Sequence, residues 1–458
     1  MKKKYTFFNR LKYAIRYIKN NRKRKKRRLK KWVKNALLLI FILIIVYLIF
    51  NRFSVKNIYI LDNEIHFVLS SGNKNIYCML TDSDTTPTLD SELWVKAYDK
   101  ECIFDYDSSK HNLYIKKKNN IIYNNKKSIV FNFKFDKEKQ YLPSDNKYKI
   151  NYTYDYIGKN PKITFVSSDT NVVKIENKNI ITVDDGKAII SANYNNETTD
   201  MEIISTSLIV NKPKDYDFKK KFLPCEKYSS EENDLLDEIL YTRVHDVGFK
   251  TRAAAVEAAR FLTLEFPYRI NYFNENGSMS ETEINKIDGE GRYYHIGLYL
   301  NTNRYESIAK SSKEPKVWGC PLYSIYVDKT MDNGLDCSGF VTWALLNAGY
   351  DVGDIGSGYS ENRDLTDISK QVANSTQLME SGKIKVGDLL HSNKLGGHIG
   401  MLIGMDDEYY YVAQAIWYDE RGVVITKETK KSFLSEFPHI VLMDSYYEED
   451  GNLTNMWY

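Results

Sequence analysis

The stretch Asn333-Gly-Leu-Asp-Cys-Ser-Gly-Phe-Val-Thr-Trp-Ala-Leu-Leu-Asn-Ala-Gly349 decides how the C-terminal third of this chain is interpreted. Phe340, Ala344 and Ala348 recur at helical spacing, and the closing glycine is a typical helix end. The pattern predicts a helix that begins at or just after Cys337. Free amide groups and partial positive charge at a helix N-terminus lower the pKa of a thiol and can stabilise an oxyanion. A buried cysteine that only packs is the competing interpretation.

A cysteine nucleophile needs a base within reach, and the later strands supply candidates. His398 follows Gly396-Gly397, which permits close approach, and precedes an apolar run that is typical of a buried strand. His391 is a weaker rival, and a structural histidine is the competing interpretation of either one. Gln414 lies on the next predicted strand and has the polarity and reach to orient an imidazole, unless it is simply a polar residue of an edge strand.

The five cysteines suit an oxidising compartment if four of them pair and one stays free. Their spacing does not fix the connectivity. The simplest scheme pairs Cys78 with Cys102 and Cys225 with Cys320, which leaves Cys337 as the free thiol.

The N-terminal segment differs in charge from the rest of the chain. Residues 1 to 34 carry 17 of the Lys and Arg residues and no acid, so the formal charge of +5 becomes 5 − 17 = −12 for the remainder. An uncharged apolar run, Ala36 to Phe50, follows directly. This order predicts a basic cytoplasmic tail (1–34), a retained transmembrane helix (35–52) and C-terminal domains outside the cell, in preference to nucleic-acid binding.

Residues 54–142 consist of short runs that alternate apolar and polar residues, which predicts a β-rich, Ig-like module. The next stretch, 143–211, contains Ile163-Thr-Phe-Val-Ser-Ser-Asp-Thr-Asn-Val-Val-Lys-Ile175 and Asp185-Gly-Lys-Ala-Ile-Ile-Ser-Ala192. These strings resemble the bacterial group 2 Ig-like domain. The resemblance implies a role in spacing or adhesion and offers no catalytic chemistry.

A linker separates these modules from a region in which helical patterns return. Ser229 and Glu232 form a potential capping box, and Thr251 is a potential cap for the alanine-rich segment that follows it. We assign these helices to a C-terminal domain over residues 222–458.

Four ordered motifs in this domain resemble the NlpC/P60 family of cysteine peptidases. They are Asp336-Cys-Ser-Gly-Phe-Val341, Gly387-Asp-Leu389, Gly397-His-Ile-Gly400 and Gln414-Ala415. The resemblance implies a papain-like α+β fold and cleavage of peptidoglycan stem peptides, often between D-glutamate and a diamino acid. By the same resemblance Cys337 is the nucleophile, His398 the base and Gln414 the third residue, and Asp336 and Ser338 line the substrate subsite.

The sequence departs from the family pattern in two ways: the gap from Trp318 to Cys337 is longer than usual, and a tyrosine of the family is replaced. Members carry a tyrosine in a Pro-Tyr-x-Trp-Gly-Gly string before the nucleophile, and this chain has Lys316 there, with Tyr323 or Tyr326 as possible substitutes.

For the whole chain, the expected fold class combines a single transmembrane helix, two β-sandwich Ig-like modules and a papain-like α+β domain.

Two other functions remain compatible with these motifs. One is a catalytically inactive surface adhesion or wall-binding protein, and the other is an amidase or acyltransferase that uses the same Cys-His pair. The sequence has no ligand spacing typical of zinc and no phosphate-binding loop, so we expect no metal and no cofactor. The expected partners are peptidoglycan stem peptides and, through the N-terminal helix, the bacterial membrane, with no nucleic acid.

Overall fold

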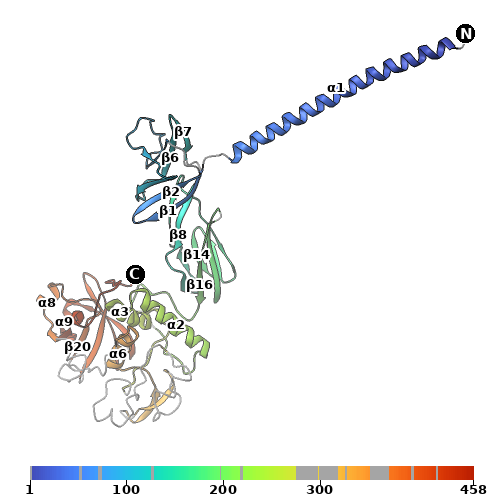
Figure 1. The fold of residues 1–458 in the computed structure, drawn as a ribbon. Coiled ribbons are helices and arrows are strands. Elements are labelled where there is room, and N and C mark those ends of the chain that lie inside the picture. Colours follow the sequence, from blue (N-terminus) through green and yellow to red (C-terminus); the bar gives the residue numbers. More distant parts are fainter. Residues whose placement is uncertain are drawn as a thin grey trace. The chain divides into compact units, whose positions relative to one another are not determined.

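A computed structural model of the 458-residue chain describes residues 3–50, 54–70, 75–124, 128–195, 197–216, 220–274, 298, 318–324, 327–350, 371–392, 397–418 and 421–458. The chain divides into two compact units, and segments of one unit alternate with segments of the other along the sequence, which the colours of Figure 1 follow. The first comprises Met1–Asp136, Asn151–Thr164 and Ala192–Thr199, and the second comprises Lys137–Ile150, Phe165–Ser191 and Asp200–Tyr458.

The first unit contains one long helix and short antiparallel strands. Its elements are α1 (Lys3–Phe50), β1 (Val55–Leu61), β2 (Glu64–Leu69), β3 (Ile76–Thr81), β4 (Val95–Lys96), β5 (Glu101–Asp105), β6 (Asn112–Lys117), β7 (Asn120–Asn124), β8 (Ile129–Phe135) and β11 (Tyr152–Ile157). The strands form sheets in the orders β1-β2-β5, β4-β3-β6-β7 and β11-β8. Alternate side chains of β2, β3 and β6 face a common apolar core, as the period-2 pattern of the sequence requires.

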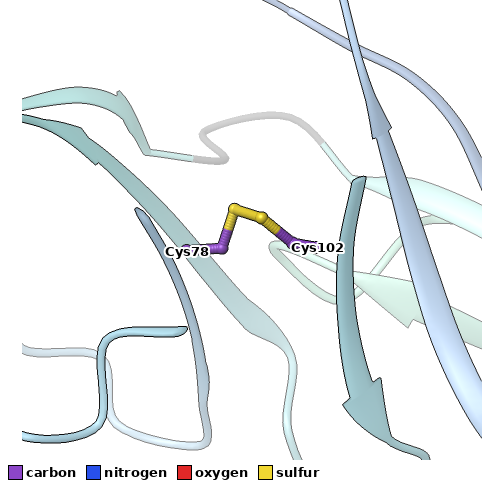
Figure 2. The surroundings of a disulfide bond; sticks show 2 residues. All are labelled: Cys78 and Cys102. Carbon is purple, nitrogen blue, oxygen red and sulfur yellow. A yellow bond between two sulfur atoms is a disulfide. The ribbon is translucent and has the colours of Figure 1, made fainter. Parts of the chain in front are cut away.

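A disulfide lies within this core. Cys78 on β3 and Cys102 on β5 are joined, and both are almost completely buried (Figure 2). The bond links the sheet that contains β3 to the sheet that contains β5, so the two sheets are held by a covalent bond as well as by apolar contact.

Seven strands carry most of the group 2 Ig-like strings, and they belong to the second unit except for residues 164, 192–194 and 197–199, which belong to the first. They are β9 (Lys139–Pro143), β10 (Lys147–Lys149), β12 (Thr164–Ser167), β13 (Val173–Glu176), β14 (Asn179–Thr182), β15 (Gly186–Tyr194) and β16 (Glu197–Thr206). They form sheets in the orders β12-β15-β16-β9 and β10-β14-β13, and β9 runs parallel to β16.

The rest of the second unit carries the shorter helices and the largest sheet. Its elements are α2 (Ser230–Asp246), α3 (Arg252–Arg260), the π-helix η1 (Phe261–Glu265), β17 (Pro321–Ser324), β18 (Lys329–Asp332), α6 (Cys337–Asn347), β19 (Gln371–Ala373), α8 (Thr376–Glu380), β20 (Leu389–Ser392), β21 (His398–Met405), β22 (Tyr409–Ile416), β23 (Gly422–Thr429), α9 (Lys430–Glu436), β24 (His439–Val441) and the 3₁₀ helix η3 (Met443–Ser445).

Both predicted helix caps are confirmed. The Ser229 hydroxyl accepts a hydrogen bond from the Glu232 amide, and the Glu232 carboxylate accepts one from the Ser229 amide, which completes a capping box for α2. The Thr251 hydroxyl caps α3 by accepting from the Ala254 amide.

The six-stranded sheet has the order β19-β24-β20-β21-β22-β23 and is antiparallel throughout. One set of alternating side chains, including Ile399 and Met401, packs in the core that contains α3 and α6. The other set, including Leu402 and Val412, packs with Phe433 of α9. The sheet is therefore buried on both faces, and α6 lies against β21 and β22.

The fold class expected from the sequence is wrong. The chain is mostly β-sheet with few helices, so a papain-like α+β domain is not supported. That fold was implied by the resemblance of four short motifs, and motifs of a few residues each do not determine how the strands and helices of a whole domain are arranged.

The expected transmembrane helix is also wrong. Over the described part of the chain, no helix combines the length and the hydrophobicity that crossing a membrane requires. Helix α1 is one continuous element from Lys3 to Phe50, and Lys and Arg are dense up to Lys34.

Candidate active site

The N-terminus of α6 holds the free thiol. The helix begins at Cys337, as predicted, because the Asp336 carboxylate caps it by accepting from the Gly339 amide at 2.7 Å. The Ser338 hydroxyl donates to the same carboxylate oxygen at 3.1 Å. Asp336 and Ser338 are both buried. They form the helix cap beside the thiol, and their expected contact with substrate stays a prediction.

The thiol of Cys337 is 5% exposed and is surrounded by hydrogen-bond donors. Burial and the neighbouring Asp336 carboxylate raise its pKa to about 12, and hydrogen bonds from the Ile399 amide, the Ser338 amide and the Tyr272 side chain oppose this rise. The lowered pKa expected from the helix N-terminus is therefore wrong, because desolvation of the thiolate exceeds the effect of the helix. At neutral pH the resting site holds a protonated thiol.

His398 is held by two successive side-chain hydrogen bonds. The Gln414 amide nitrogen donates to the Thr426 hydroxyl at 2.6 Å, which turns the amide oxygen toward the imidazole. That oxygen lies 2.5 Å from His398 Nε2. Because an amide oxygen can only accept, Nε2 carries the proton and Nδ1 is left as the basic nitrogen. Burial lowers the pKa of His398 from 6.5, although the Gln414 hydrogen bond opposes this shift, so the imidazole is neutral at neutral pH.

Strand β21 brings the two halves of the site together. It begins at His398, and the next residue, Ile399, supplies the amide that bonds the Cys337 thiol. Gln414 lies on the adjoining strand β22 and Thr426 lies on β23, so three neighbouring strands position the imidazole. In this tautomer the imidazole keeps an unprotonated Nδ1, and the thiol is hydrogen-bonded to the residue that follows His398, so His398 is the candidate general base for that thiol.

Tyr272 is the site residue that the sequence analysis missed. Its side chain makes a hydrogen bond with the Cys337 thiol. It lies in the irregular segment that follows η1, and not in the string that precedes Cys320. Lys316 and Tyr326 lie outside the described residues, and the Tyr323 side chain is not described. The available signal was Pro267-Tyr268, a Pro-Tyr pair that follows α3 well before the nucleophile.

Two glycines hold the Tyr272 segment in place. On one side, the Leu335 amide donates to the Asn271 carbonyl at 2.9 Å, and a Cβ on Gly334 would lie 1.9 Å from that carbonyl oxygen. On the other side, the Val423 amide donates to the Ile270 carbonyl at 2.9 Å. Gly422 has a φ of +101°, and a Cβ there would lie 2.3 Å from the Ile270 oxygen. The segment is thus fixed between the approach to α6 and the start of β23.

A second disulfide lies close to helix α6 in the sequence and in its contacts. Cys225 and Cys320 are bonded, and Cys337 is the free cysteine, in agreement with the simplest pairing scheme. Trp318, two residues before Cys320, packs edge-to-face on Trp343 of α6 with ring centroids 6.2 Å apart. The bond therefore fixes the chain next to a large buried contact of α6.

Two further polar residues near the start of β20, Asp388 and His391, are also buried. Asp388 is buried with Arg252, whose guanidinium donates to it at 2.8 Å, so this motif residue holds α3 to the start of β20. His391 is fully buried, and burial lowers its pKa to about 4. It pairs in register with Ile399 and His439. Among the described residues, no group of three or more His, Cys, Asp or Glu side chains is arranged to hold a metal ion.

Comparison with known proteins adds little to this geometry. No protein-family model matches the chain, and no curated protein matches it. Domains 4 and 5 of the S-layer protein SbsC align with 20% of this chain at 12% identity and a TM-score of 0.16. A longer structure, rSbsC(31-844), aligns with 31% at 11% identity and a TM-score of 0.17. The chain spans 63% and 22% of those two chains, and similarity at this level does not show a shared fold.

Proposed function

We propose that this protein is a cell-wall hydrolase that cleaves peptidoglycan stem peptides by attack of the Cys337 thiol. The observation that carries the proposal is the arrangement on β21, where His398 adjoins the residue whose amide bonds the thiol. The chain Thr426–Gln414–His398 supports the role of His398 as base, because it leaves Nδ1 unprotonated. The substrate class comes from the resemblance of the ordered motifs to the NlpC/P60 family.

The proposed reaction is acyl transfer in two steps. His398 Nδ1 takes the thiol proton as the Cys337 sulfur attacks the peptide carbonyl carbon, and a tetrahedral intermediate forms. The imidazolium then donates that proton to the leaving amine, and the C–N bond breaks to leave a thioester. The same imidazole then deprotonates water as it attacks the thioester carbon, the C–S bond breaks to release a carboxylic acid, and the imidazolium returns its proton to the Cys337 sulfur. The Tyr272 hydroxyl and the amides of the first turn of α6 are the donors that we assign to the oxyanion, because Tyr272 and the Ser338 amide already hydrogen-bond to the Cys337 thiol.

The two disulfides support a place outside the reducing cytoplasm, where this substrate is found. Four of the five cysteines are bonded, and such bonds persist mainly in oxidising compartments.

The test is digestion of purified peptidoglycan by the full-length protein, with Cys337→Ala as the matched control and mass spectrometry of the released peptides. New amine and carboxyl termini that require Cys337 would support the proposal. Intact stem peptides with native protein, across peptidoglycans of different stem composition, would refute it.

One observation favours a second candidate, a domain that holds wall ligands without cleaving them. The thiol is nearly inaccessible and its pKa is raised, which are properties of an unreactive cysteine. In that case Cys337→Ala would bind peptidoglycan as well as the native protein does, and neither protein would release peptides.

A further inference from the structure

Three side chains form a continuous row that leads away from the thiol. Tyr272, which bonds the Cys337 thiol, meets the Trp417 ring edge-to-face with centroids 5.6 Å apart and an interplanar angle of 71°. The Arg421 guanidinium lies over the same indole, 5.1 Å from its centroid. Trp417 is 41% exposed, so the middle of this row is open to solvent beside the candidate active site.

The row is held in position by the backbone. Arg421 directly precedes Gly422, and the strand that follows is bonded to Ile270, two residues before Tyr272. The close approach at Gly422 fixes the distance between the two segments. Arg421 therefore keeps a constant place relative to Tyr272, as a residue that selects substrate must.

Arg421 lacks an acidic partner within the described residues. Its Nε is buried and has no hydrogen-bond partner in that part of the chain, and none of the recorded ion pairs involves it. The two acids that precede it, Asp419 and Glu420, lie outside the described residues. A guanidinium stacked on an indole keeps its charge and presents planar donors that match a carboxylate.

We propose that Trp417 and Arg421 form a subsite that binds a free carboxylate of the substrate, close to the bond that Cys337 attacks. The proposal rests on the proposed function, and it narrows the substrate class to peptides with an ionised carboxylate next to the cleaved bond. The indole contributes an apolar surface for the carbon chain that bears this carboxylate, and Arg421 supplies the charge.

The test uses paired stem peptides that differ only in whether the glutamyl α-carboxylate is free or amidated. For the native protein we expect kcat/KM to be at least tenfold higher for the free acid. In Arg421→Gln we expect a loss of tenfold or more on the acid and an unchanged rate on the amide. Lys427→Gln is the matched control, because it removes the same charge from a lysine of β23 that lies over the ring of Tyr409 on β22. The Lys427→Gln variant should keep the preference for the free acid over the amide.

A binding measurement separates this proposal from the proposed function. Titration calorimetry of the same two peptides with Cys337→Ala should show tighter binding of the acid, and this difference should disappear in Cys337→Ala combined with Arg421→Gln. If native protein cleaves neither peptide but the difference in binding is present, the subsite stands and the hydrolase proposal fails. Equal binding of acid and amide, or an equal loss of both in the Arg421 variant, would overturn the subsite. Should Arg421→Gln misfold, Trp417→Leu is expected to weaken binding of the acid, and unchanged binding in that variant would also overturn it.

Discussion

At the scale of single residues, the candidate site is defined by what surrounds two titratable groups. The Cys337 thiol and the His398 imidazole are both shifted toward their neutral forms, because burial penalises the charged forms. In the proposed reaction the base would therefore remove the thiol proton during attack, and a preformed thiolate is not the expected resting state.

This charge state predicts the pH dependence of activity. His398 must be neutral to act as a base, and its pKa lies below the usual 6.5. Activity should therefore rise as pH increases through that lowered pKa and should be constant from about pH 7 to 9, since the thiol pKa of about 12 lies far above this range. A kcat/KM profile measured from pH 4 to 10 checks this. A main inflection above pH 7 would contradict it.

Thr426 acts on the imidazole through Gln414. Thr426→Val removes the acceptor that orients the amide, so Gln414 can rotate and His398 loses its preferred tautomer. We expect kcat/KM to fall by roughly tenfold, the equivalent of ~1.4 kcal/mol, which is the size of one hydrogen bond. Thr426→Ser keeps the hydroxyl and should restore the rate. Equal activity of the Val and Ser variants would show that this hydrogen bond does not position His398.

At the scale of elements, a buried ion pair joins α3 to the large sheet. Arg252 is fully buried and donates to Asp388 at 2.8 Å, and it also contacts Asp444 at 2.6 Å and Asp450 at 3.1 Å. Arg252→Ala would leave the Asp388 carboxylate buried without its cation. We expect the free energy of unfolding to fall by about 3–5 kcal/mol in urea denaturation.

The control for this change is Lys383→Ala, which removes a cation from an exposed position shortly before Asp388 in the sequence. It should alter stability by less than about 0.5 kcal/mol. Similar losses in the two variants would mean that the buried pair contributes no more than a surface charge.

Local elements were predictable, and the reason is that their signals lie within a few residues of each other. The start of α6 at Cys337 and the caps at Ser229 and Thr251 each depend on neighbours in the chain. Tyr272 was not predictable in this way. Its place at the thiol depends on the contacts of Asn271 with Gly334 and of Ile270 with Gly422, which are distant in sequence.

At the scale of the whole molecule, sequence patterns predicted strands better than they predicted the fold class. Alternating residues correctly indicated a β-rich chain, but the apolar run after Lys34 did not produce a helix that could cross a membrane among the described residues. Helix α1 continues without interruption from the basic segment into that apolar run, from Lys3 to Phe50.

We expect the Cys225–Cys320 disulfide, which closes the longer loop, to contribute more to the stability of its unit than Cys78–Cys102 contributes to the stability of its own. Cys225 and Cys320 are 95 residues apart, so their bond restricts the unfolded chain more than a bond over 24 residues does. Replacing both by Ser should lower the stability of that unit by about 5 kcal/mol, compared with about 3 kcal/mol for Cys78 and Cys102 in their own unit. Calorimetric unfolding of each double variant measures both values. A smaller loss for the longer loop would contradict this order.

The central claim is that Cys337 attacks stem peptides with His398 as its base. The most direct measurement is digestion of peptidoglycan by the full-length native protein, Cys337→Ala and His398→Asn under identical conditions, with released termini identified by mass spectrometry. The account predicts new stem-peptide termini with native protein, none with Cys337→Ala and a rate reduced at least 100-fold with His398→Asn. Identical products from native protein and Cys337→Ala, or no products from any of the three, would contradict it.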